Sequence, residues 1–442
     1  KKYYYDKNIL NLSMQEINNI KYFFITQFKK SLVLKVIGAL LSLIAHIVPA
    51  RILNLDYYSI YSYTLSLFFI FLLISKLGID IATVKYVASL KNDLNQGKIK
   101  GYIKEAIRTI FFSSLSMAII LLFLLFFFKN KLLFIYFNTF VIFVLIIPIV
   151  SIQDFLSGVF RGYSKIIYSE LPESIIKPLL FFVFLFIFIF FEFNLNSAHF
   201  ALIFFLTCFA TLAISLITFY QVIFIKLKKI KTIKFYKLLK NSLPILFGSG
   251  LYLIIIQTDL VMLGLISEVK NVGLYAPAAK ISSFIFFIVS IFTVFTSPLF
   301  SELYKSKNFN KLKKIIKMTT IYSSIIALVF LILIIFFGKF ILSIYGYNFT
   351  SSYIAMLILS ISYFFTTTTV AREFMIMSDL HNESAKIIFI TLFFNIILNY
   401  ILISQYGING AAIATALSLF LMNVIMTIVV YKKTSINPTI FQ

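Results

Sequence analysis

The stretch LLFFVFLFIFIFF, residues 179–191, contains only apolar side chains and shows no alternation between apolar and polar positions. A strand of a membrane barrel would alternate, whereas a transmembrane helix needs about 20 predominantly apolar residues in sequence. The rest of the chain has the same character: 61% of its 442 residues are hydrophobic, 13% are charged and the mean hydropathy is +0.98. The sequence therefore predicts an all-α polytopic membrane protein.

Apolar windows long enough to cross a bilayer recur along the chain. We predict about twelve transmembrane helices, at residues 32–50, 58–77, 106–128, 134–158, 167–191, 199–225, 243–265, 277–300, 319–342, 353–377, 382–404 and 409–431. Their grouping predicts an N-terminal cytoplasmic or interfacial segment, a six-helix bundle, a basic cytoplasmic linker, a second six-helix bundle and a cytoplasmic tail, at residues 1–31, 32–225, 226–242, 243–431 and 432–442.

The basic residues of the chain are concentrated in alternate loops between the predicted spans. A net charge of +24 is compatible with nucleic-acid binding, but the placement of the basic residues favours another interpretation. If the N-terminus is cytoplasmic, the lysines and arginines that fall outside the cytoplasmic segments are Arg51, Lys129, Lys131, Lys270, Lys280 and Lys339, out of 40. By the positive-inside rule this predicts that both termini are cytoplasmic. We therefore expect no nucleic-acid partner.

The two halves of the sequence repeat each other. The segment VFRGYSKIIYSELPESIIK (159–177) aligns with VAREFMIMSDLHNESAKII (370–388), which matches Arg161 with Arg372. Six predicted helices, an even number, separate the two copies, so both halves have the same orientation in the membrane. Parallel repeats of this kind are a transporter architecture, with the substrate bound between the halves.

Three further parts of the chain resemble a known family. QTDLVMLGLISEVKNVGLYAPAAKI (257–281) with SPLFSELY (297–304) resembles the seventh and eighth helices of O-antigen-type, Wzx-like polysaccharide flippases. FFNIILNYILISQYGINGAAIATALS (393–418) resembles their penultimate-to-last helix passage, and GVFRGYSK (158–165) their fourth-helix exit. These flippases belong to the multidrug/oligosaccharidyl-lipid/polysaccharide exporter (MOP) superfamily.

The resemblance implies two six-helix bundles around a central cavity. It also implies a flippase that moves undecaprenyl-diphosphate-linked oligosaccharide, for lipopolysaccharide or other polysaccharide synthesis, from the inner to the outer leaflet by alternating access. The expected membrane is the bacterial cytoplasmic membrane. The expected partners are the lipid-linked oligosaccharide, membrane lipids and a coupling ion, H⁺ or Na⁺.

Several other chemistries lack their motifs in this sequence. GxxxxGK[ST], HExxH and CxxC are absent, and GSGLYL (248–253) lacks the third glycine of a dinucleotide fingerprint. With only three histidines and the single Cys208, we expect no metal, no cofactor and no internal disulfide. A glycosyltransferase or polysaccharide polymerase would need catalytic groups on a sizeable outward loop, so we do not expect an enzyme. A cation-coupled drug exporter of the same superfamily stays an alternative.

The candidate substrate-binding residues are basic side chains, and four of them, Arg161, Lys177, Arg372 and Lys386, lie at or near predicted cytoplasmic helix ends. Arg161 and Arg372 are symmetry-related, and two facing guanidinium groups suit a diphosphate, because each binds phosphate oxygens in a bidentate way. The weaker candidates are Lys177, Lys386, Lys85 and Lys280, which the positive-inside pattern or contact with an interface would also explain. Glu173 and Glu383 are predicted to pair with these cations when the site is empty, because an unpaired charge in a span is costly.

One acidic residue lies inside a predicted span. Asp259, in QTDLVMLGLI (257–266), is about 26 Å along the seventh span, where an ionised carboxylate on a lone helix costs roughly 2.5–3.5 kcal/mol. It must therefore face protein or water. Either it pins a helix end by accepting a hydrogen bond from the start of the next span, or it pairs with Arg51 as an outer gate.

Overall fold

The computed structural model describes residues 14–90, 96–127, 134–226 and 235–440. The first half of the chain forms α1 (Met14–Ile52), α2 (Leu55–Ser75), α3 (Ile79–Leu90), α4 (Gln96–Phe127), α5 (Phe134–Gly162), α6 (Ile166–Leu171), the π-helical turn η4 (Pro172–Ile176), α7 (Lys177–Phe190), α8 (Ser197–Val222) and η5 (Phe224–Lys226). The second half forms α9 (Phe235–Ile245), the π-helical turn η6 (Leu246–Gly250), α10 (Leu251–Ile266), α11 (Val269–Lys305), α12 (Phe309–Tyr345), η7 (Tyr347–Ser352), α13 (Tyr353–Thr367), α14 (Ala371–Met377) and α15 (His381–Thr434).

Helices long and apolar enough to cross a membrane account for most of these elements. Ten of them meet both criteria in the described residues. The last, α15, holds two of the predicted spans, because Gly407 (φ 54°, ψ −128°) interrupts the helical backbone in a region that glycine adopts without steric cost. The seventh predicted span lies in α9, η6 and α10, which includes the apolar helix Leu251–Ile266. The predicted all-α membrane fold is therefore confirmed.

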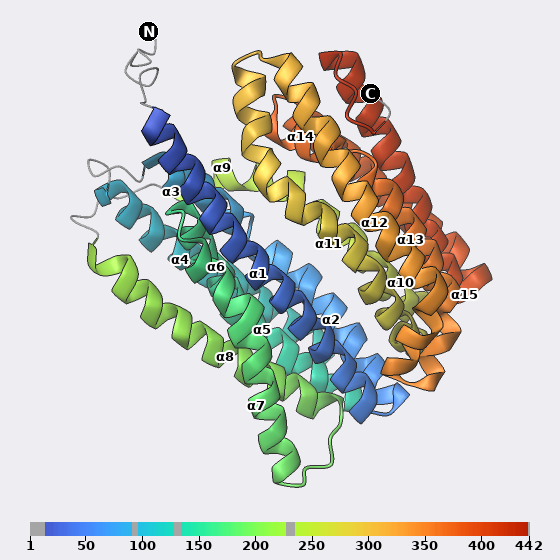
Figure 1. Ribbon diagram of the computed structural model, residues 1–442. Coiled ribbons are helices and arrows are strands. Elements are labelled where there is room, and N and C mark those ends of the chain that lie inside the picture. The colour runs from blue at the N-terminus through green and yellow to red at the C-terminus, as the bar shows by residue number, and fades with distance from the viewer. Residues whose placement is uncertain (1–13, 91–95, 128–133, 227–234, 441–442) are drawn as a thin grey trace.

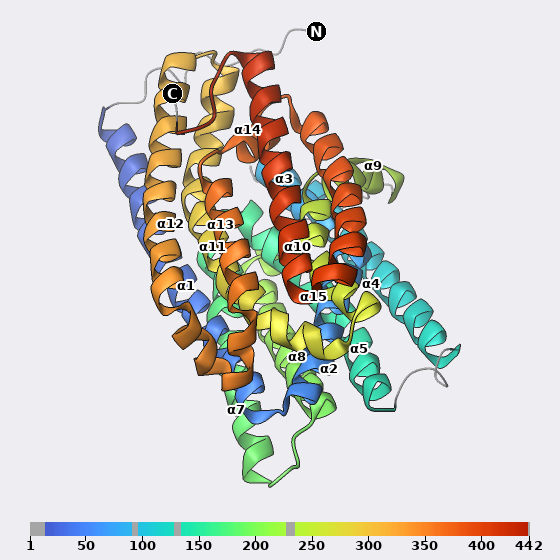
Figure 2. The same cartoon turned by 90° about the vertical axis from the view of Figure 1, so that its right-hand side faces the viewer.

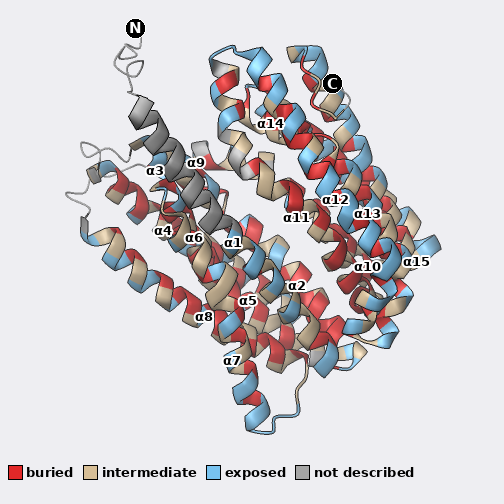
Figure 3. Ribbon diagram, in the orientation of Figure 1, coloured by how far each residue is buried: buried red, intermediate tan, exposed pale blue. Residues whose placement is uncertain are grey.

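The helices form two groups, α1–α8 and α10–α15, as Figure 1 shows. The groups lie against each other at one end and separate toward the end where α1 begins and α15 ends (Figure 1). We call these the closed end and the open end. In the view turned by 90°, α12, α13 and α15 stand together as one layer (Figure 2). Figure 3 shows exposed residues along α12 and α15, and on α12 many of these are apolar, as expected for contact with lipid.

Contacts at the closed end connect the two groups. Arg51, in the last turn of α1, donates from Nε to the carbonyl of Ile344 at 2.5 Å and from Nη2 to that of Ser343 at 2.8 Å, both in α12. The rings of Tyr58 in α2 and Phe349 in η7 meet edge to face with centroids 5.4 Å apart. The halves are thus joined where α1 ends and α2 begins.

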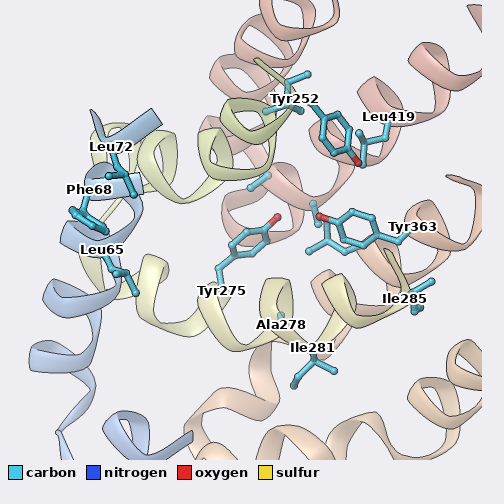
Figure 4. Packing of buried hydrophobic residues seen from close by; sticks show 14 of the residues in the cluster. Leu65, Phe68, Leu72, Tyr252, Tyr275, Ala278, Ile281, Ile285, Tyr363 and Leu419 are labelled. Atoms are coloured by element: carbon cyan, nitrogen blue, oxygen red, sulfur yellow. The ribbon is translucent and has the colours of Figure 1, made fainter. Parts of the chain in front are cut away.

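One apolar core extends through both groups. It includes Phe68 of α2, Ile255 of α10 and Ile285 of α11, all buried. Figure 4 shows Leu65, Phe68 and Leu72 along α2, and Tyr275 and Tyr363 with their hydroxyl ends pointing toward the same interior space. Burial of this apolar surface against neighbouring helices positions the polar groups described below.

The boundaries of several predicted segments differ from the observed elements. The predicted interfacial segment is, from residue 14 onward, part of one continuous helix with the first span, and residues 1–13 lie outside the described part. Of the predicted linker, residues 227–234 also lie outside it, while 235–242 are the first turns of α9, which packs on α3 and α4. The predicted tail folds back: Val370 N–H donates to the Pro438 carbonyl, and Ile440 N–H to that of Thr368.

Candidate substrate site

Two adjoining cavities lie between the halves. One, of about 330 Å³, is lined by α2, α5, η4, α7 and α10, and the other, of about 200 Å³, by α1, α2, η4, α7, α8 and α11. They share Phe69, Glu173 and Lys177, and we call them together the central cavity. Its side chains that carry charge or a hydrogen-bonding group are Ser42, His46, Tyr61, Lys76, Asp154, Glu173, Lys177, Thr207, Gln257 and Lys280.

Lys177 is the cation common to both cavities. Its Nζ is 2.9 Å from Oε1 of Glu173, one turn earlier, and 5.1 Å from the ring centroid of Phe204 in α8. The side chain of Lys177 is 16% exposed and that of Glu173 is 50% exposed, so the acid faces the open space and the lysine stands beneath it. A ligand anion can reach Lys177 by displacing this single partner.

Lys280 faces the central cavity from the other half of the protein. It lies in α11, and its Nζ donates to Ser42 Oγ of α1 at 3.3 Å. Within the described residues no carboxylate lies within 4.0 Å of this ammonium group. A half-buried cation with a hydroxyl partner is an attractive site for an incoming anion, because an unpaired charge away from water is costly.

A third lysine, which the sequence did not single out, completes the positive lining. Lys76 Nζ is 2.8 Å from Oδ2 of Asp154 in α5 and 2.9 Å from Oδ2 of Asp80 in α3. Neither Asp154 nor Gln257 was predicted from the sequence as a site residue. The sequence feature that could have indicated this site is the charged pair Lys76 and Asp80, which are four residues apart at the end of an apolar span.

The two predicted arginines do not face each other across the central cavity. Arg161 is an exposed residue that donates to Ser169 Oγ at 2.9 Å and lies 3.8 Å from Glu170, both in α6. Neither Arg161 nor Arg372 lines either cavity. The alignment placed both near helix ends, but it could not show which way each local backbone break turns the side chain.

Arg372 is engaged inside the second half. Its Nη2 is 2.5 Å from Oε1 of the adjacent Glu373, and its guanidinium carbon lies 4.1 Å from the ring centroid of Tyr252 and 5.4 Å from that of Phe286. Stacking of this kind ties α14 to α10 and α11. In this conformation Nε and Nη2 of Arg372 both donate to Glu373, so a bidentate contact of Arg372 with phosphate stays a prediction.

The remaining predicted cations lie apart from the central cavity. Lys85 and Lys386 are exposed, and neither lines it. Glu383 pairs with Lys433 at the end of α15, whereas Glu173 pairs with the predicted cation Lys177. Of the candidates from the sequence, Lys177, Glu173 and Lys280 are therefore the ones that the structure brings together.

Asp259 is buried within the second half and does not contact Arg51. Its Oδ2 accepts a hydrogen bond from Tyr275 Oη of α11 at 2.7 Å. Its Oδ1 accepts from Asn399 Nδ2 at 3.3 Å and from Thr415 Oγ1, on the two segments of α15. The predicted pairing with Arg51 is thus wrong for this conformation, because Arg51 contacts the carbonyls of Ser343 and Ile344 instead.

Removing the Arg51 side chain should open the closed end. We expect Arg51→Ala to raise, several-fold, the labelling of a cysteine placed at the buried Ser59, because two charge-assisted hydrogen bonds between the halves are lost. The measurement uses an impermeant thiol reagent in a Cys208→Ala background, with Lys339→Ala as the matched control. Asp259→Asn should leave this labelling unchanged, since Asp259 bonds within the second half and does not contact Arg51. Unchanged labelling in Arg51→Ala would contradict a closing role for Arg51.

Comparison with known families now places the chain. A family model described as "Polysaccharide biosynthesis protein" matches residues 30–304, more than half of the sequence. The chain belongs to this family. A second model, described as MatE, matches residues 244–401. Both matches agree with the resemblance to MOP-superfamily flippases that the sequence motifs carry.

Two individual proteins are similar to parts of the chain. The chain is 29% identical over 172 residues to the "Probable flippase AglR" of Haloferax volcanii, which covers 38% of the chain and 36% of that protein. It is 28% identical over 294 residues to the "Uncharacterized membrane protein MJ1068" of Methanocaldococcus jannaschii, covering 62% of the chain and 55% of that protein. The matched segments thus span about a third and about half of these relatives' lengths.

The fold is also found among solved structures. An inward-facing conformation of a multidrug resistance MATE family transporter of the MOP superfamily superposes with a TM-score of 0.74 at 14% identity, covering 90% of this chain and 96% of the other. At this identity the likeness shows the fold. Family and fold together show a multi-pass membrane protein of the polysaccharide biosynthesis protein family, with a fold similar to that of MATE transporters.

Proposed function

We propose that the protein flips a lipid-linked oligosaccharide carrying a diphosphate from the inner to the outer leaflet of the cytoplasmic membrane. The observation that carries this proposal is the central cavity, where Lys177 of the first half and Lys280 of the second line one part, and Lys76 and Lys177 line the other. Membership of the polysaccharide biosynthesis protein family supports a sugar-bearing substrate. Transport by alternating access needs no enzyme chemistry and no cofactor.

The substrate phosphates are held between Lys177 and Lys280. These two residues lie in opposite halves, so a single diphosphate that contacts both replaces the weak contact of Lys280 with Ser42 by a charged bridge. A ligand shifts a conformational equilibrium only when it binds one state better. A bridge of this kind is available only when the halves are close around the cavity, so it favours the state in which the open end closes.

The orientation in the membrane follows from charge. Placing the open end in the cytoplasm gives both termini the orientation that the positive-inside rule favours. In this orientation the central cavity receives substrate from the inner leaflet, and the closed end at Arg51 seals it from the outside. A bacterial cytoplasmic membrane and coupling to H⁺ or Na⁺ are part of the proposal.

One observation favours a second candidate, a drug exporter of the same superfamily. The cavity also contains Asp154 and Glu173, which would suit a cationic drug. Each of these acids is already bonded to a lysine, at 2.8 and 2.9 Å respectively, and Lys280 adds a third cation to the lining, so lysines outnumber acids there by three to two. The balance of charge favours an anionic substrate.

The test is a leaflet assay with the purified protein in vesicles. We expect lipid-diphosphate oligosaccharide loaded in one leaflet to become accessible to an external lectin without ATP, and faster under an H⁺ or Na⁺ gradient. Empty vesicles and a lipid-linked sugar without phosphate are the controls. Export of cationic dyes with no exposure of sugar under any gradient would establish the drug-exporter function instead.

A further inference from the structure

Lys76 stands at a break in a membrane helix. α2 ends at Ser75 and α3 begins at Ile79, and the connecting residues Leu77 (φ 52°) and Gly78 (φ 69°) have left-handed backbone conformations. A residue other than glycine, such as Leu77, rarely adopts this backbone conformation, so surrounding contacts must hold the break in place.

Two ion pairs of Lys76 stabilise this break. Lys76 Nζ bonds to Asp80, across the break on α3, at 2.9 Å and to Asp154 of α5 at 2.8 Å. The side chains of Lys76, Asp80 and Asp154 are 11%, 15% and 26% exposed. We call these three residues the Lys76 latch. One ammonium group therefore joins both sides of the break to a neighbouring helix.

The latch opens onto the central cavity from one side. Lys76 and Asp154 line the cavity of about 330 Å³ together with Glu173 and Lys177, whereas Asp80 does not line it. An anion in this cavity therefore approaches Lys76 from the side of Asp154. It meets a site where two carboxylates already share one cation, so the anion and Asp154 repel each other and compete for the same ammonium group.

We propose that an anionic group of the substrate displaces Asp154 from Lys76 and thereby frees the α2–α3 break from α5. The proposal rests on the proposed function, in which the substrate carries phosphate. Asp80 stays bonded because it lies one turn away on the same chain segment, while Asp154 belongs to another helix. Substrate recognition and release of α3 thus occur through the same lysine, which couples cavity occupancy to movement at the open end.

The first test measures binding to the purified protein. With a short-chain isoprenyl diphosphate as probe and the isoprenyl alcohol as control, Asp154→Asn should bind the diphosphate about tenfold more tightly than the unchanged protein, a factor that corresponds to about 1.4 kcal/mol. The double variant Lys76→Met/Asp154→Asn should lose this gain, because no cation is freed. The double variant leaves one carboxylate, that of Asp80, without its cation, whereas Lys76→Met alone would leave two. Asp56→Asn, an exposed acid at the other end of α2, is the matched control.

The second test observes the break directly. Spin labels at Ser89→Cys in α3 and Lys314→Cys in α12, both exposed, report the separation of the halves at the open end in a Cys208→Ala background. We expect the distance distribution of ligand-free Asp154→Asn to shift toward that of the diphosphate-bound unchanged protein.

The outcomes separate the two proposals. Equal binding by the unchanged protein and Asp154→Asn, or a gain that persists in the double variant, would overturn the displacement while leaving the substrate class intact. An unaltered distance distribution in Asp154→Asn would also overturn the latch. No binding of diphosphate to either protein would overturn the proposed function and the displacement together.

Discussion

Replacing both Lys177 and Lys280 by methionine is expected to abolish transport of the lipid-linked oligosaccharide. The two ammonium groups face the central cavity from opposite halves, and methionine keeps the length of the side chain while removing its charge. A hydrogen bond to a charged group contributes about 1.5–3 kcal/mol, so each single change should lower the initial rate roughly ten- to a hundredfold. The vesicle leaflet assay measures these rates.

The single variants differ in a way that tests the geometry. Lys280→Met removes a cation with a hydroxyl partner and should leave stability nearly unchanged, whereas Lys177→Met leaves the half-exposed Glu173 without its partner. Lys280→Arg should restore part of the activity, because the charge is retained. Lys313→Met, on an exposed part of α12, is the control. Normal transport by Lys280→Met would show that the substrate does not bridge the halves.

Replacing Asp259 by alanine should cause the largest loss of stability. Asp259 is 3% exposed, and its carboxylate accepts hydrogen bonds from Tyr275, Asn399 and Thr415. Asn399 also donates to Asn395, so the hydroxyls of Tyr275 and Thr415 are the donors that lose their acceptor. A buried polar group left without a partner costs about 1–3 kcal/mol, so we expect a total loss of at least about 2 kcal/mol. The thermal unfolding midpoint should fall by several degrees.

The chain offers its own reporter for this measurement. Cys208 is the only cysteine and is buried, so a maleimide dye reacts with it when the protein unfolds. Asp379→Ala removes an exposed acid and serves as the control. Asp259→Asn should lie between the unchanged protein and Asp259→Ala, because the amide oxygen still accepts hydrogen bonds. An unchanged unfolding midpoint for Asp259→Ala would show that the network does not stabilise the second half.

Parts of the candidate site could be predicted from the sequence, and the reason differs from residue to residue. Lys177 could be predicted from its place near a cytoplasmic helix end, and Lys280 was a weaker candidate that contact with an interface would also explain. Arg161 and Arg372 were preferred on chemical grounds, but the structure engages both within their own halves. Lys76 was not nominated, because its role depends on Asp154, 78 residues away in the sequence.

The sequence by itself determined the all-α membrane fold and the positions of the spans, because long apolar windows leave the backbone no way to satisfy its hydrogen bonds in lipid except as helices. It also carried the family motifs. Only the tertiary structure decided which polar side chains meet. Helix breaks at Leu77 and Gly78, at Gly407 and between α13 and α14 rotate each following segment, and the periodicity of the apolar residues does not encode that rotation. Asp259 therefore meets Asn399 and Thr415, and Lys76 meets Asp154, through the packing of helices that are distant in the chain.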